Sequence, residues 1–136
     1  MTNTFSNTDL RPKSEGPILS FGAGQGLGYA TGAGGAITQL TSKATGVTLN
    51  TVCGAITTHN ASLAGAASVS FTLTNSAIAA TDVVLVSVKS GASTGLYTIA
   101  VTATGAGTCQ ITITNIGATA GEVIVINFAV HKAVIA

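Results

Sequence analysis

Residues Ser68–Asn75 read SVSFTLTN, a strict alternation of small polar side chains with larger apolar ones. Successive side chains of an extended strand point to opposite faces of the sheet. We therefore expect Val69, Phe71 and Leu73 to face a core and the serines and threonines to face away from it. Forty residues later, segment 112–115 (TITN) echoes the end of this stretch. The alternation predicts a β-strand with one buried face, and its echo predicts a second strand of the same kind.

Outward from this stretch, eight short segments have strand periodicity or β-branched composition, and Gly, Asn and Ala turns separate them. The predicted strands are Ile37–Thr41, Val47–Asn50, Gly54–Asn60, Ser68–Asn75, Val83–Lys89, Leu96–Thr104, Cys109–Thr114 and Glu122–Val134. In the sixth of them, the inward residues are expected to be Tyr97, Ile99, Val101 and Ala103. No stretch keeps a helical period long enough to predict a helix. The predicted strands recur about every ten residues, which is typical of a sandwich. The predicted fold is all-β: a jelly-roll-like antiparallel β-sandwich of about eight strands.

The repeat continues beyond the two echoed strands. Asp82 precedes the apolar run Val83–Val86, and Glu122 precedes the similar run Val123–Ile126 at the same distance from its own TLTN or TITN segment. The same strand–loop–strand unit is thus used twice. Two such units closing one sandwich favour a double Greek key.

Three regions divide the chain. Residues Met1–Phe21 are polar, contain both prolines and have no period, which predicts an extended N-terminal arm. Residues Gly22–Gly35 form a glycine-rich connector. Residues 36–136 are predicted to be the sandwich, and a chain of 136 residues favours one domain with a core of its own.

Charge is the most unusual property of the composition. Charged residues make up 7% of the chain, against a usual value of about 25%. Four of the nine, Asp9, Arg11, Lys13 and Glu15, lie in the first fifteen residues. A free monomer normally uses mixed charges to stay soluble and to protect its sheet edges. We expect a neutral surface that is largely covered by neighbouring subunits.

The same composition argues against two classes of partner. The net charge is +1 and no basic run is present, so binding to nucleic acid through phosphate neutralisation is not expected. The longest apolar stretch, Val123–Ala136, is interrupted by Asn127, His131 and Lys132 and is too short for a membrane span. No signal peptide is recognisable. We expect no membrane partner.

The glycine-rich connector invites a phosphate-binding interpretation, but its spacing does not fit. A dinucleotide fingerprint needs glycines at i, i+2 and i+5 between a strand and a helix, and no Gly-Lys-Ser/Thr is present. Asp82 and Glu122 hold equivalent places in the repeat and could form a catalytic carboxylate pair. The favoured interpretation is that each caps a loop by accepting backbone N–H bonds.

Other chemistry is weakly signalled. Cys53 and Cys109 with His59 and His131 could in principle hold zinc, but none has the close ligand spacing of a structural zinc motif. The favoured interpretation is two small buried thiols and two ordinary imidazoles, although a disulfide between the cysteines stays open. No Gly-x-Ser-x-Gly elbow is present. Asn60 begins a sequon that matters only in a secreted protein. The chain is expected to be no enzyme and to need no cofactor or metal.

Several segments resemble structural proteins of tailed bacteriophages. They are Gly28–Gln39 (GYATGAGGAITQ), Thr45–Asn50 (TGVTLN), Phe71–Ser76 (FTLTNS), Ala80–Val84 (ATDVV) and Asn127–Val130 (NFAV). The chain is similar, over about Gly28 to Ala133, to small head decoration (cement) proteins and to modules of phage fibres. The resemblance implies a jelly-roll-like sandwich, often oligomeric, without catalysis. It supplies no catalytic residues.

These considerations predict a capsid decoration protein that binds the major capsid protein on the outer surface of the phage head. It would be made in the cytoplasm of the host bacterium. The alternative is a tail-fibre tip or receptor-binding module, and a carbohydrate-active enzyme is disfavoured because carboxylates are so few. The arm is expected to anchor to coat subunits through Arg11, Lys13, Ile18, Leu19 and Phe21. A homo-oligomer is expected from the shortage of charge, with a trimer favoured over a dimer by the resemblance.

Overall fold

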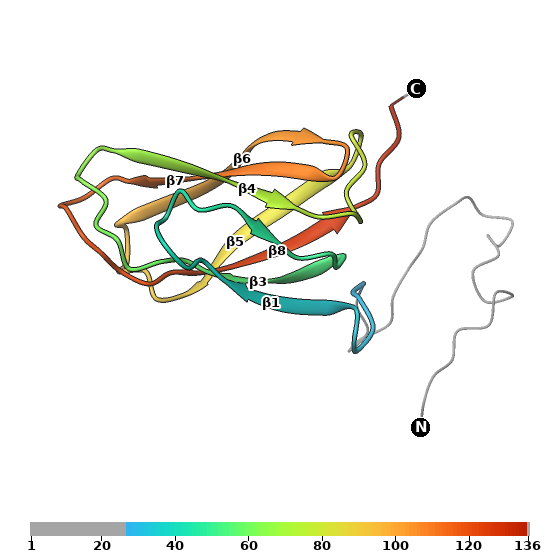
Figure 1. Cartoon of the computed structure of the whole chain (residues 1–136), viewed down its shortest axis with the longest axis horizontal. Coiled ribbons are helices and arrows are strands. Elements are labelled where there is room, and N and C mark those ends of the chain that lie inside the picture. The colour runs from blue at the N-terminus through green and yellow to red at the C-terminus, as the bar shows by residue number, and fades with distance from the viewer. Residues whose placement is uncertain (1–26, 136) are drawn as a thin grey trace, which may run out of the picture.

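The computed structural model describes residues 27–135, which form two four-stranded β-sheets packed face to face (Figure 1). The strands are β1 (Gly34–Thr38), β2 (Val47–Thr48), β3 (Cys53–Thr57), β4 (Ser68–Thr74), β5 (Val83–Ser90), β6 (Tyr97–Gly105), β7 (Thr108–Asn115) and β8 (Val125–His131). No helix occurs among the described residues. The prediction of an all-β sandwich of about eight strands is confirmed. The predicted arm and its five candidate anchor residues lie outside the described residues.

Sheet A has the strand order β1-β3-β8-β5, and sheet B has the order β2-β4-β7-β6. Four of the six strand pairs are antiparallel, as predicted. The pairs β1–β3 and β2–β4 are parallel, so the expected antiparallel pairing does not extend to these two sheet edges. Parallel neighbours require a crossover connection. Between β1 and β3, the chain supplies it by crossing to sheet B, forming β2 and returning.

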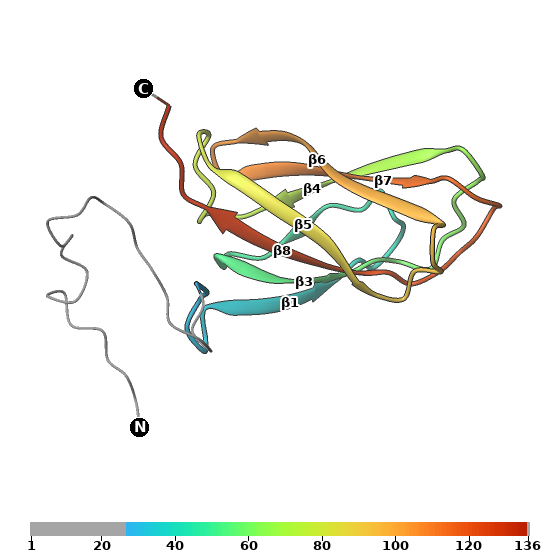
Figure 2. The ribbon, with the colours of Figure 1, turned by 180° about the vertical axis from the view of Figure 1, so that it is seen from behind.

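The two sheets come together at their edges as well as over their faces. The edge strands β5 of sheet A and β6 of sheet B contact each other at one side of the sandwich, the side that faces the viewer in Figure 2. Residues 27–33 and the segment that follows β8 lie at one end of the sandwich, on the right of Figure 1. We call this the terminal end. The other end, which carries the loops after β3 and before β8, is the loop end.

The repeat seen in the sequence has a structural counterpart. Its first copy is β4, a loop and β5, and its second copy is β7, a loop and β8. β4 pairs with β7 in sheet B, and β5 pairs with β8 in sheet A, both antiparallel. The two copies therefore interlock across both sheets and do not form two separate Greek-key units.

Side chains from both inner faces make one core. Sheet B contributes Phe71, Leu73, Ile111 and Ile113, and sheet A contributes Ile56, Ile126, Phe128 and Val130. These are the alternate positions that the sequence pattern selected in β4 and β7, and burying them is the main stabilising contribution to folding. Val69 is only half-buried but packs against this core, as Ile99 and Val101 do.

One predicted core residue is placed differently. Ala103 is exposed, because the pairing of β6 with β7 shifts register between Val101 and Ala103. A β-bulge adds a residue to one strand and so reverses the alternation beyond it. The period-two pattern continues through this point in the sequence, which is why the pattern alone predicted an inward Ala103.

The first strand begins earlier than expected. Gly34 and Gly35 belong to β1 and not to the predicted connector. A Cβ atom on Gly35 would lie 2.8 Å from Leu49 Cδ1, and one on Gly54 in β3 would lie 2.7 Å from the Gly35 carbonyl oxygen. Glycine at these positions allows the edge strand to approach its neighbour and Leu49 closely. Low β-propensity concealed this role in the sequence.

Candidate functional site

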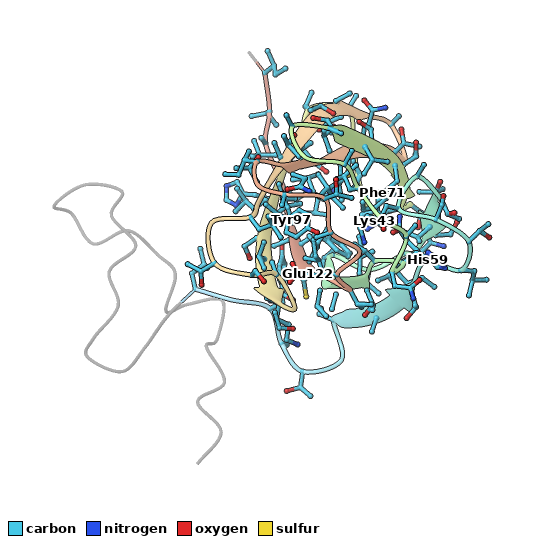
Figure 3. The ribbon with its side chains drawn as sticks, turned by 90° about the vertical axis from the view of Figure 1, so that its left-hand side faces the viewer. Lys43, His59, Phe71, Tyr97 and Glu122 are labelled. Atoms are coloured by element: carbon cyan, nitrogen blue, oxygen red, sulfur yellow. The ribbon has the colours of Figure 1, made fainter. Side chains whose placement is uncertain are left out.

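The loop end holds a cluster of buried polar side chains centred on Lys43. The Lys43 side chain comes from the loop between β1 and β2, and its ammonium donates to the backbone oxygens of His59 and Glu122, the latter at 2.6 Å. Figure 3 looks onto this end and labels all three residues. Lys43 is buried. One ammonium group thus joins three loops that are distant in the sequence.

Gln39 and Thr58 complete this cluster. The Gln39 amide donates to the backbone oxygens of Lys43 (3.1 Å) and Thr45 (2.8 Å) and accepts from the His59 N–H (3.2 Å). The Thr58 hydroxyl accepts from the N–H of Ile124 (2.9 Å). Buried side-chain nitrogen and oxygen atoms of the described residues all have hydrogen-bond partners. Each buried side-chain nitrogen and oxygen of the cluster therefore has at least one internal hydrogen-bond partner.

The electrostatics of the cluster agree with a structural role. Burial lowers the pKa of Lys43, and the charge of Glu122 partly opposes this. The Glu122 carboxylate accepts from the Ser93 hydroxyl (2.5 Å) and N–H (3.1 Å), and these bonds lower its pKa. Burial also raises the pKa of Tyr97, whose hydroxyl donates to the Ala120 oxygen at 3.4 Å. The Glu122 carboxylate is thus held ionised as the cap of a loop.

Asp82 performs the same task at the terminal end. It accepts from the Ala79 N–H (2.7 Å) and from the Lys132 ammonium (2.6 Å), and the first of these bonds is the larger cause of its lowered pKa. Asp82 precedes Val83, which pairs with the last residue of β8, whereas Glu122 precedes the first residue of β8. Six residues of strand separate these ends by about 20 Å. The catalytic-pair hypothesis is therefore wrong, and the loop-capping interpretation of both acids is confirmed.

The cysteines and histidines are also dispersed. Cys53 lies in sheet A and Cys109 in sheet B, and both are free thiols. Burial raises the pKa of Cys109 to about 11, so the thiol is protonated and inert at neutral pH. The His59 ring accepts from the Ala61 N–H at 3.0 Å. Within residues 27–135, no three His, Cys, Asp or Glu side chains lie together in a way that could hold a metal ion.

The two outer faces of the sandwich differ in chemistry although both are nearly uncharged. The outer face of sheet B is a lattice of hydroxyl groups. Ser68 bonds with Thr114 (2.7 Å), Ser70 with Thr112 (2.8 Å), and Thr112 also with Thr102 (2.9 Å). These cross-strand pairs bind one another and still meet water, so this face is suited to solvent.

The outer face of sheet A combines small and apolar residues with the polar side chains of Ser87, Lys89 and Asn127. Gly34, Cys53, Ala55 and Ala129 line a hollow of about 500 Å³, and Leu85 from β5 stands beside them. Val83 and Leu85 are half-exposed, at 48% and 56%. The sequence signal for this face was the alternation of Gly, Ala and Cys in β1 and β3, whereas in β8 only Ala129 follows it, beside Asn127 and His131. It was not recognised because strand pairing was unknown.

No helix of residues 27–135 has the length and apolarity to span a bilayer. No protein-family model, curated protein or solved structure matches the chain.

Proposed function

We propose that the chain is a virion structural protein of a tailed bacteriophage that decorates and stabilises the assembled head. The observation that carries this proposal is the near absence of charge on both faces of the sandwich. Of the five charged side chains among residues 27–135, Lys43 is buried and Asp82 pairs with Lys132. A sandwich without mixed surface charge is poorly protected as a free monomer and suits a molecule that works covered by neighbours.

The described residues support binding over catalysis. The buried polar side chains at both ends bond within the chain, and the two carboxylates with lowered pKa values are engaged as loop caps. The resemblance to decoration proteins in segments such as Gly28–Gln39 agrees with this class of function. The partner in this proposal is the major capsid protein, together with further copies of the chain.

The proposed mechanism is mass action. A ligand that binds only the assembled shell stabilises it by a free energy that rises with the logarithm of its free concentration over its dissociation constant. The arm would order on coat subunits through main-chain hydrogen bonds along a sheet edge or groove. Ile18, Leu19 and Phe21 would supply apolar contacts, and Arg11 and Lys13 would pair with coat acids. Bridging neighbouring subunits would oppose the outward pressure of packaged DNA.

Co-sedimentation with undecorated phage heads tests the proposal. Full-length protein is expected to sediment with the heads, and a chain lacking residues 1–20 is expected to stay in the supernatant while melting at nearly the same temperature. A control variant with Ala100→Ser on the outer face of sheet B should bind like the wild type. Cryo-electron microscopy of the particle then locates the protein. Density at a fibre tip instead of the head surface would overturn the proposal in favour of the receptor-binding alternative.

A further inference from the structure

The hollow on the outer face of sheet A has a floor of small side chains. One row of paired residues crosses the four strands in the order Gly34, Cys53, Ala129 and Leu85. A Cβ atom on Gly34 would lie 3.3 Å from Cys53 Sγ, so the thiol leans over the bare backbone of the edge strand. Leu85 is 56% exposed and stands at the other side of this floor. The floor therefore has room for apolar side chains that would cover Leu85 and the Cys53 thiol.

A polar border adjoins this floor on the side of the loop end. Ser87 and Asn127 pair with each other in the sheet, and Lys89 lines the hollow two residues further along β5. A hydroxyl and a carboxamide can each donate to and accept from main-chain groups. An apolar floor beside side chains that bond to a backbone suits an extended peptide segment, whose own main chain needs such partners.

The area of this face favours a segment of the same chain over a separate molecule. Four strands about 4.8 Å apart and about six residues long present a footprint of roughly 400 Å². That area is half of the roughly 800 Å² that each partner buries in a standard interface between two molecules. A tethered segment needs less area, because its attachment raises its effective concentration to the millimolar range.

The described part of the chain begins beside this hollow. Tyr29 lies in the segment that leads into β1, and its hydroxyl donates to the carbonyl oxygen of Val130, the residue after Ala129 in β8. The chain therefore enters the sandwich next to the row that contains Ala129. Phe21 is eight residues before Tyr29 and thus within about 28 Å of it, whereas the sheet measures only about 14 Å from its first strand to its last. Residues 15–21 can therefore reach the hollow of their own chain.

The sequence of residues 15–21, EGPILSF, matches the hollow in chemistry. Its three large apolar side chains are Ile18, Leu19 and Phe21. The floor of glycine, alanine and cysteine is the part of the face that can bury them. Glu15 precedes them and is opposite in charge to Lys89, the one charged residue that lines the hollow. The segment thus offers an apolar part to the floor and an acid to the border.

The spacing of these groups also matches when the segment runs along β5 from the terminal end toward the loop end. Glu15 and Phe21 are six residues apart, and so are Lys89 and Val83. Extended chains advance by about 3.3 Å a residue, so Glu15 reaches Lys89 when Phe21 lies beside Val83. Leu19 then lies on the row of small side chains.

We propose that residues 15–21 of the free protein lie in the hollow of their own chain, with Leu19 on the row of small side chains and Glu15 beside Lys89. This contact goes beyond the proposed function, because it forms without a head. It rests on that function only for its consequence, which is that the apolar side chains assigned to the coat contact are held on the body until a head is met. Binding to the head would then exchange one set of apolar contacts for another and would expose the hollow.

The Cys53 thiol reports on this contact in the full-length chain. Cys109 is buried and its pKa is raised to about 11, so a maleimide reacts first with Cys53. Leu19→Asp places a charge over the apolar floor and is expected to raise the rate of this reaction by about tenfold. The matched control is Phe5→Asp, the same kind of change elsewhere in the arm, which should leave the rate unchanged. Far-ultraviolet circular dichroism of each variant checks that the sandwich is intact.

A disulfide shows whether the segment belongs to the same copy. Leu19→Cys is expected to form a disulfide with Cys53 under mild oxidation, at a rate that does not depend on protein concentration. The product is a monomer that migrates faster than the reduced chain in non-reducing electrophoresis. Phe5→Cys should form such a product about tenfold more slowly, because docking does not raise its effective concentration near Cys53.

Each measurement can overturn the proposal. Equal maleimide rates for wild type and Leu19→Asp would show that the segment does not cover Cys53, and so would equal oxidation rates for Leu19→Cys and Phe5→Cys. A disulfide-linked dimer from Leu19→Cys would assign the hollow to the arm of a second copy. Both measurements are made without heads, so neither depends on the decoration function. Protection of Cys53 in a protein that fails to bind heads would reject the decoration function alone.

Discussion

At the scale of single residues, buried polar side chains set the geometry of the loops. Asn75 and Asn115, which end the two copies of the sequence repeat, are both fully buried. Each accepts from the N–H two residues later at 2.9 Å, and each donates to a carbonyl oxygen of a distant loop, Asn75 to Thr51 and Asn115 to Leu63. The Lys43 ammonium also donates to carbonyl oxygens of distant loops, through a longer side chain. The paired asparagines explain why the echoed TLTN and TITN segments both end in this residue.

Removing the buried ammonium should destabilise the fold. Lys43→Met keeps most of the packing volume but leaves the His59 and Glu122 carbonyl oxygens without their donor. An unsatisfied buried acceptor costs about 1–3 kcal/mol, so we expect a loss of that order in the free energy of unfolding. Urea unfolding measures it. Lys89→Met, at an exposed position, should change stability by less than about 0.5 kcal/mol. Equal effects of the two changes would show that the Lys43 hydrogen bonds do not stabilise the fold.

A change of one atom tests the asparagine anchors. Asn115→Asp replaces the amide that donates to Leu63 and Ala118 with an acceptor, and at neutral pH it buries an unpaired charge. We expect a loss of about 3–5 kcal/mol at pH 7. Burial should raise the pKa of the new carboxyl, so the loss should shrink as the pH falls and the group protonates. Asn60→Asp, at an exposed position, is the control, and a loss that does not depend on pH would reject this explanation.

At the scale of elements, the edge pair β1–β3 depends on glycine packing. Gly54 lies where an added Cβ would meet the Gly35 oxygen at 2.7 Å, Phe128 Cε1 at 2.9 Å and Leu49 Cδ2 at 3.0 Å. The backbone oxygen cannot move without displacing β1. Glycine is unfavourable in a strand for entropic reasons, and here close approach of the edge strand compensates for that cost.

Gly54→Ala is therefore expected to separate β1 from β3. Overpacking of this kind costs about 1–3 kcal/mol, and thermal unfolding of the purified protein should show it as a lowered midpoint. Gly28→Ala is the matched control, because a Cβ there meets nothing within 4 Å. If both substitutions leave the midpoint unchanged, β1 does not pack as closely as described.

At the scale of the whole molecule, one carboxylate closes each end of the sandwich. Asp82 joins the loop before β5 to the segment after β8, and Glu122 joins the loop before β8 to Ser93 in the loop before β6. The two clamps lie at opposite ends of β8, so protonating both loosens the molecule from both ends. Acid stability is thus a property of the whole fold and not of one site.

The direction of the pH effect follows from the lowered pKa values. A carboxyl whose pKa is lower in the folded state stabilises the fold above its usual pKa, and this contribution is lost as the pH falls through the folded value. The usual values are 3.8 for Asp82 and 4.5 for Glu122. Scanning calorimetry should show a melting temperature that begins to fall near pH 4.5 and continues to fall below pH 3.8. The double variant Asp82→Asn and Glu122→Gln should melt lower at pH 7 with a shallower acid decline, and an unchanged slope would assign the decline to other groups.

The sequence by itself determined the class of fold, the number of strands and most of the core. Period-two alternation in segments such as Ser68–Asn75 specifies which side chains face inward, because burying them is the main driving force for folding. It also indicated that Asp82 and Glu122 cap loops. These properties depend on neighbours along the chain.

Tertiary structure alone decided everything that depends on which strands become neighbours. Several features join residues that are distant in sequence: the parallel pairs at two sheet edges, the bulge that exposes Ala103, the hydrogen bonds of Lys43 and the hollow on sheet A. Local sequence patterns do not specify these pairings, because the free energy that selects them comes from long-range contacts that form only when the chain folds.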